Sequence, residues 1–243
     1  MLPLENMLKT LKLSGFKKRL EMTESQGIPE SWSYQTFLSK LCEHELAKRF
    51  QLRVSSWRRE SGLNVAKSFV KLELGDYPTQ ISQSIRQLQQ QHDWVDSAHD
   101  VLLFGPFDVG KSHIAHALGL ALIDQGVRVK SFQATALVQQ LLQAKQALDL
   151  MGFMKKLNKY RAILIDGIGY VKKTEGETQV LFEFIAHRYE SGSLIITSNQ
   201  PFSQWDSIFS DSLMTIAAVN CIIHHACILK SKGKASEKKQ PLK

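Results

Sequence analysis

The sequence has 243 residues, a formal net charge of +8 and a pI near 9.3. Hydrophobic residues make up 43% and charged residues 22%, which excludes a chain that is disordered throughout. The positive charge favours a polyanionic partner, nucleic acid before an anionic membrane surface, although a solvated basic surface without a partner would have the same composition.

The compartment is predicted from the cysteines and the N-terminus. Three cysteines are present, Cys42, Cys221 and Cys227, an odd number without a CxxC pair, and this usage fits a reducing compartment. The N-terminus lacks the apolar stretch of a signal peptide, and no apolar run approaches the ~20 residues of a membrane helix. We therefore expect a cytoplasmic protein with no membrane partner.

The first 62 residues are predicted to be helical, because apolar residues recur at helical spacing from Leu4 to Leu13 and again from Phe37 to Leu46. A basic segment comes directly after the second of these runs. Its candidate DNA-contacting residues are Lys48, Arg49, Arg53, Arg58 and Arg59. Lysine and arginine bind phosphates without sequence preference, but composition alone favours a solvated charged face.

Residues 63–99 are expected to form a connector with one glutamine-rich helix over 81–94. From residue 100 short apolar runs alternate with helical patterns up to residue 229, which predicts an α/β domain with a parallel sheet. The expected strands are 101–104, 127–132, 162–165 and 194–197, and the expected helices are 113–125, 134–148 and 177–189. The lysine-rich segment 230–243 is expected to be disordered.

A phosphate-binding loop follows the first expected strand. The sequence GPFDVGKS matches G-x-x-x-x-G-K-[ST] without a gap, between a strand and a helix as the mechanism requires. Lys111 is expected to reach the β- and γ-phosphates of ATP, and the Ser112 hydroxyl to ligate Mg²⁺. The predicted ATP-binding residues are Gly105, Pro106, Phe107, Asp108, Val109, Gly110, Lys111 and Ser112.

Asp108 places a carboxylate inside this loop. A side chain that faces inward would repel the nucleotide, whereas one that faces solvent would cost little. The sequence leaves both orientations open.

The third apolar run, 162–165, ends in Asp166, which is the Walker B form and predicts a second Mg²⁺ ligand that acts through water. The next position, where many such ATPases have an acid that polarises the attacking water, is Gly167, so hydrolysis is expected to be slow. Asn199 follows the fourth run and either orients the water or caps the turn before Pro201.

Beyond these motifs the chain resembles IstB-type transposition helpers, the ATP-binding partners of DNA transposases, from about Leu4 to about Ala226. The most specific part of the resemblance is the run RYESGSLIITSNQPFSQW, and the others are VLLFGPFDVGKSHIAHALG and LIDGIGY. Helicase loaders of the DnaC type are close relatives of that family.

The resemblance implies an AAA+ fold, a parallel sheet flanked by helices, behind a small all-helical N-terminal domain. It implies ATP-dependent self-association on double-stranded DNA, contact with a transposase, and a sensor role for Asn199 beside Asp166. It also favours a DNA contact over a solvated charged face for the basic segment.

The chain departs from the family pattern at three places. Phe107 and Asp108 replace the usual Pro-Gly of the loop, Gly167 replaces the acid, and Cys221 stands where a candidate arginine finger is expected. The sequence therefore predicts an ATP-binding accessory protein for DNA transposition that hydrolyses ATP poorly. A DnaC-like helicase loader, and a hydrolysis-deficient nucleotide-binding DNA scaffold or degraded transposon copy, are the alternatives.

Overall fold

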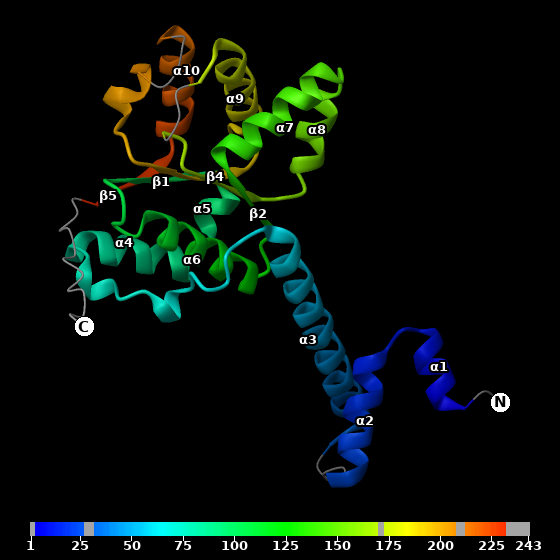
Figure 1. The fold of residues 1–243 in the computed structure, drawn as a ribbon. Helices are drawn as coiled ribbons and strands as arrows, with labels where there is room; N and C mark the ends of the chain where they lie inside the picture. The colour runs from blue at the N-terminus through cyan, green and yellow to red at the C-terminus, as the bar shows by residue number, and fades with distance from the viewer. Residues whose placement is uncertain (1–2, 27–31, 170–172, 208–211, 232–243) are drawn as a thin grey trace, which may run out of the picture. The chain divides into compact units, whose positions relative to one another are not determined.

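The structure is a computed structural model that describes residues 3–26, 32–169, 173–207 and 212–231. The chain divides into two compact units, Met1–Ser56 and Trp57–Lys243, which are treated separately below (Figure 1). Among the described residues, no helix has both the length and the apolar character needed to cross a bilayer.

The N-terminal unit is helical, as predicted. Its elements are α1 (Leu4–Thr10), α2 (Ser14–Gln26) and most of α3 (Tyr34–Ser61). The start of α2 approaches α3 closely, because the Gly15 N–H donates to Glu45 Oε2 over 2.5 Å. A Cβ at Gly15 would lie 2.8 Å from the Glu45 Cα, so a glycine is required where the two helices meet.

The larger unit contains one parallel five-stranded sheet in the order β2-β3-β4-β1-β5. The strands are β1 (Asp100–Phe104), β2 (Val129–Gln133), β3 (Ala162–Asp166), β4 (Ser193–Ser198) and β5 (Ala226–Lys230). The first four correspond to the expected strands, with β2 displaced toward the C-terminus. The chain order of parallel strands with helices between them confirms the predicted fold class.

Helices cover both faces of the sheet (Figure 1). The helices α4 and α6 lie on one face, and α7, α9 and α10 on the other. The helices of this unit are α4 (Thr79–Gln90), α5 (Asp93–Asp96), α6 (Lys111–Asp124), α7 (Ala134–Gln146), α8 (Leu150–Leu157), α9 (Glu175–Arg188) and α10 (Ser212–Ile223). The short 3₁₀ turns are η1 (Phe69–Lys71), η2 (Leu74–Asp76) and η3 (Phe202–Ser207).

Several expected boundaries were wrong. The helix predicted over 134–148 ends at Gln146. Leu148, two residues later, has a positive φ of 56°, and α8 follows as a separate helix. The helix predicted over 81–94 is likewise divided into α4 and α5. Lys230 ends β5 and the Ser231 N–H donates to Phe104 O over 2.9 Å, so these two residues of the expected tail belong to the sheet. Residues 232–243 lie outside the described residues.

Candidate nucleotide-binding site

The predicted phosphate loop joins the end of β1 to the start of α6, at the carboxyl edge of the sheet. Gly105 and Gly110 have φ values of 155° and 85°, in the region that favours glycine. A Cβ at Gly105 would lie 2.6 Å from Ser231 O, and one at Gly110 would overlap the Tyr77 hydroxyl. Neighbouring parts of the unit therefore leave no room for a side chain at either glycine of the loop.

Lys111 lies inside this loop and is buried, with 5% of its surface exposed. Its Nζ donates to Pro106 O over 2.6 Å. Burial lowers the pKa of Lys111, and the nearby charges of Asp166 and Asp108 oppose that shift. A buried ammonium at the N-terminus of a helix favours an anion beside it, which fits the phosphates of a nucleotide.

Asp108 is exposed, as is Phe107, and its φ of 61° is left-handed. Aspartate tolerates this conformation better than most side chains with a Cβ, because its short polar group can bond locally. The charge of Asp108 acts on Lys111, where it opposes the lowering of the pKa by burial.

The two predicted Mg²⁺ ligands lie together. The Ser112 hydroxyl donates to Asp166 Oδ1 over 2.7 Å, and the Thr197 hydroxyl donates to the same oxygen over 2.6 Å. Because the Ser112 O–H points at the carboxylate as a hydrogen-bond donor, the lone pairs of its oxygen stay available for a cation. The Ser112 hydroxyl and the Asp166 carboxylate, which is buried with 5% of its surface exposed, are oxygen ligands of the kind that Mg²⁺ prefers.

Two further residues reach this carboxylate and were missed from the sequence. Gln133 Nε2 donates to Asp166 Oδ2 over 3.3 Å, and His116 Nε2 lies 3.8 Å from the same oxygen. Burial lowers the pKa of His116, and the charge of Asp166 opposes the shift. His116 follows Ser112 by four positions, a helical spacing that places both on one face, and this was the available sequence signal.

Gly167, the position of the expected acid, has a φ of 81°. Its N–H donates to Thr197 Oγ1 over 2.8 Å, and Thr197 in turn donates to Asp166. The backbone at Gly167 is therefore part of the network that holds Asp166. A carboxylate placed there would have to accept a left-handed backbone, which costs a residue with a Cβ about 1–2 kcal/mol.

Asn199 lies just beyond the end of β4, whose last carbonyl, Ser198 O, accepts the Gly105 N–H over 3.3 Å. Within the described part of the chain, Asn199 Oδ1 is buried and has no hydrogen-bond partner. The turn after it is held by Trp205, which is fully buried and packs near Phe104 and Phe202. Asn199 is thus at the edge of the phosphate loop with a free acceptor.

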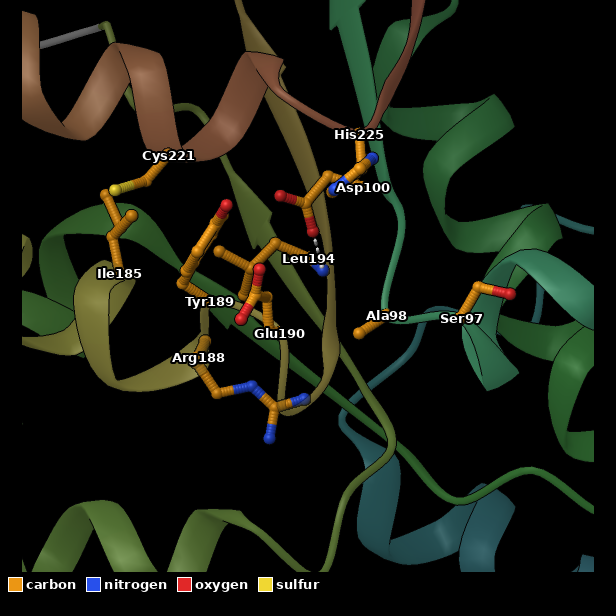
Figure 2. Close-up of a pocket in the computed structure, with 10 residues that line it drawn as sticks. All are labelled: Ser97, Ala98, Asp100, Ile185, Arg188, Tyr189, Glu190, Leu194, Cys221 and His225. Atoms are coloured by element: carbon orange, nitrogen blue, oxygen red, sulfur yellow. Dashed lines mark hydrogen bonds between the residues drawn. The ribbon is translucent and has the colours of Figure 1, made fainter.

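Cys221 lies at the end of the sheet opposite the phosphate loop, where β1 and β4 begin. Figure 2 shows it on α10. Together with Asp100, Arg188 and Leu194 it lines a cavity of about 20 Å³. Such a cavity has room for about one water molecule. Cys221 is partly buried and packs against the core. The thiol at the expected finger position is therefore used in packing within its own unit.

The five predicted DNA-contacting residues all lie on α3 but differ in their partners. Arg49 bonds to Glu45 over 2.7 Å, and Arg58 bonds to Asp124 through two oxygens, at 3.0 Å from Nε and 2.6 Å from Nη2. None of the ion pairs among the described residues involves the remaining three. These are Lys48, Arg53 and Arg59.

The sequence relatives agree with this site. The family model of the IstB-like ATP binding protein matches residues 6–243. The chain belongs to the IstB-like ATP-binding family. A putative insertion sequence ATP-binding protein of Sinorhizobium fredii is 38% identical over 92% of this chain and 75% of its own length. The IS21 putative ATP-binding protein of Pseudomonas aeruginosa is 29% identical over 99% of this chain and 90% of its own.

Solved structures show the fold of this IstB-like chain. The DnaC helicase loader matches with a TM-score of 0.54 at 17% identity, over 63% of this chain and 89% of that one. DnaI matches with a TM-score of 0.58 at 14% identity, over 70% of this chain and 95% of that one. Both likenesses confirm the predicted AAA+ architecture for this IstB-like chain.

Proposed function

We propose that this protein is an ATP-binding helper of a DNA transposase, that it binds ATP with Mg²⁺ at the phosphate loop, and that it hydrolyses ATP weakly. The observation that carries the proposal is the corner formed by Ser112, Asp166 and Thr197 beside the buried Lys111. The insertion sequence relatives support the transposition role over that of a helicase loader.

The chain's own groups divide the work at this site. The bare backbone of the loop and Lys111 bind and orient the phosphates, and Ser112 with Asp166 would hold Mg²⁺, which supplies positive charge to the phosphate oxygens. The proposed role of Asn199 is to orient the attacking water, and its buried Oδ1, which has no hydrogen-bond partner among the described residues, supports that role. What is lacking is a carboxylate at position 167 that could take a proton from that water.

The partner side of the proposal rests on charge and family. The net charge of +8, and the three cations of α3 that form no ion pair with the described residues, support binding to double-stranded DNA without sequence preference. Self-association into an ATP-dependent oligomer and contact with a transposase are proposed from the family, and a cytoplasmic location from the cysteine usage. The domain limits proposed for these roles are 1–62 and 63–99 as expected, and the ATP-binding domain extends from 100 to 231 because Lys230 and Ser231 bond to β1.

The test is ATP binding and turnover by the whole chain, with and without duplex DNA. We expect nucleotide binding that requires Lys111, together with turnover that is slow and little changed by DNA. A Lys111→Ala variant should lose nucleotide binding while it keeps the circular dichroism of the wild type. Rapid turnover stimulated by DNA would refute weak hydrolysis, and nucleotide binding that persists in Lys111→Ala would refute the site.

A matched pair of variants separates the missing acid from the backbone. Gly167→Asp introduces a carboxylate, and Gly167→Asn introduces a side chain of the same size with similar tolerance of the left-handed backbone but without charge. Turnover that rises in Gly167→Asp alone would locate the defect in the missing base. Equal turnover in both variants would place it elsewhere.

A further inference from the structure

The Asp166 carboxylate has neighbours that the phosphate-loop and Walker B motifs do not explain. Its Oδ1 accepts from Ser112 of the phosphate loop and from Thr197 of β4. Its Oδ2 accepts from Gln133 over 3.3 Å and faces His116 at 3.8 Å. Polar groups from α6, β4 and the end of β2 therefore surround both oxygens.

The protonation of the His116 ring follows from its other contact. The Asn64 N–H donates to His116 Nδ1 over 3.2 Å, so Nδ1 is an acceptor and carries no proton. In a neutral imidazole the proton is then on Nε2, the nitrogen that faces Asp166. A protonated nitrogen cannot ligate a metal, but it can direct its N–H dipole at a carboxylate. This geometry excludes His116 as a ligand in the observed arrangement.

Burial makes this dipole effective. The side chains of His116 and Asp166 are each only 6% exposed, so little water screens them from each other. The 3.8 Å separation is too long for a direct hydrogen bond, whereas Gln133 bonds to the same oxygen directly. The two groups thus act together on Oδ2 and keep Oδ1 beside the Ser112 hydroxyl.

We infer that His116 and Gln133 are positioning residues for the divalent cation of this site, which they serve by fixing the orientation of the Asp166 carboxylate. The inference rests on the proposed binding of ATP with Mg²⁺. Partners that orient a metal-binding side chain commonly change metal affinity 10–100-fold when they are removed. The loss should therefore appear in the contribution of Mg²⁺ to nucleotide binding, and little in binding without metal.

The experiment measures the dissociation constant of a fluorescent ATP analogue for the full chain in EDTA and in saturating Mg²⁺. The ratio of the two constants reports how strongly the metal and the nucleotide are coupled. We expect this ratio to fall about 10-fold in His116→Leu and several-fold in Gln133→Ala. The constant in EDTA should change less than about twofold, which a general disruption of the loop would not allow.

Two controls define the effect. His116→Gln keeps an N–H donor and should restore part of the ratio, and His113→Leu, on the same helix but bonded to Ser68 O, should leave it unchanged. Gln133 is exposed, so its substitution tests the inference even if His116→Leu does not fold.

The outcomes are distinct. A ratio equal to that of the wild type in both His116→Leu and Gln133→Ala would refute the positioning role and leave the proposed function intact. A wild type that binds no nucleotide with or without Mg²⁺ would refute the proposed function and the positioning role together.

Discussion

Asp108 shows how a single residue can be tolerated in a phosphate loop without favouring phosphate. Its left-handed φ of 61° is the conformation in which the family places glycine, and aspartate is among the side chains that adopt it most readily. The backbone of the loop is thereby kept, while one negative charge is added close to Lys111. The fold accepts this aspartate, and its charge is expected to weaken the binding of phosphate.

We expect Asp108→Gly to bind ATP several-fold more tightly than the wild type, because the charge that repels phosphate is removed. Asp108→Asn keeps the conformational preference and removes only the charge, so it should give most of the same gain. Isothermal titration at low and high salt would measure both. A gain in Asp108→Gly that is absent from Asp108→Asn would assign the effect to the backbone instead.

Asp100 begins β1, at the end of the sheet opposite the phosphate loop, and a second prediction concerns its titration. Burial raises its pKa to about 7, and the Leu194 N–H that it accepts and the charge of Arg188 only partly oppose this. The folded chain then holds a proton that the unfolded chain has lost. Stability should therefore fall as the pH rises from about 4 to about 7.

In Asp100→Asn this titration is absent. The free energy of unfolding of the variant minus that of the wild type should increase between pH 4 and pH 7 and stay constant above pH 7. Urea denaturation at several pH values would measure the difference. Stability curves that run parallel over this range would contradict the prediction.

The residues of the site were predictable in part. The phosphate loop, Asp166 and Asn199 follow from local patterns in which a strand ends at a fixed edge. His116, Gln133 and Tyr77 were not found, because each acts through a contact across more than 30 positions of sequence. Nothing in the local sequence of the glutamine marks it as a partner of Asp166.

At the scale of elements, Glu60 joins the last turn of α3, which is part of the sheet unit, to β2 and to the residues before β3. Its carboxylate accepts from Tyr160 and Arg128, each over 2.6 Å, and from Lys159 over 3.0 Å. Its carbonyl accepts from Lys130 over 2.7 Å. The hydrogen bond from Tyr160, followed by those from Arg128 and Lys159, lowers the pKa of Glu60 to about 2.

Glu60→Gln should destabilise the protein by about 1–2 kcal/mol at pH 7, because charge-assisted hydrogen bonds are weakened. The folded pKa is depressed, so this stabilisation is present above about pH 4.5 and is lost as the pH falls toward 2. Urea denaturation at pH 7 and pH 3 would show a smaller difference at the lower pH. Equal stability of variant and wild type at pH 7 would contradict the role.

The elements themselves were predictable where burial is complete. The strands β3 and β4 are buried at every position and appear in the sequence as continuous apolar runs. The edge strand β5 was missed because only one of its five residues is buried and it directly follows two histidines. The boundary between α7 and α8 depends on a left-handed turn at Leu148, a residue type that rarely indicates one.

At the scale of the whole molecule, the cations of α3 are the part most open to a test of DNA binding. Lys48, Arg53 and Arg59 should each release counterions from a bound duplex. Replacing all three with glutamine should therefore lower the slope of log affinity against log salt by roughly 2–3. Fluorescence anisotropy over a range of salt concentrations measures that slope.

Arg58→Gln is the matched control, since the guanidinium of Arg58 is already bonded to Asp124. It should change the slope less than a single glutamine substitution at Lys48, Arg53 or Arg59 does. A triple variant with the salt dependence of the wild type would exclude this helix from the DNA contact.

Gly167 also bears on which acid the position after Asp166 can accept. Its left-handed backbone donates its N–H to Thr197, which in turn donates to Asp166. Aspartate adopts a left-handed backbone more readily than glutamate, because its short polar side chain can bond locally. Of the two acids, aspartate is therefore the one that a single substitution could place here while the turn and its hydrogen bond to Thr197 are kept.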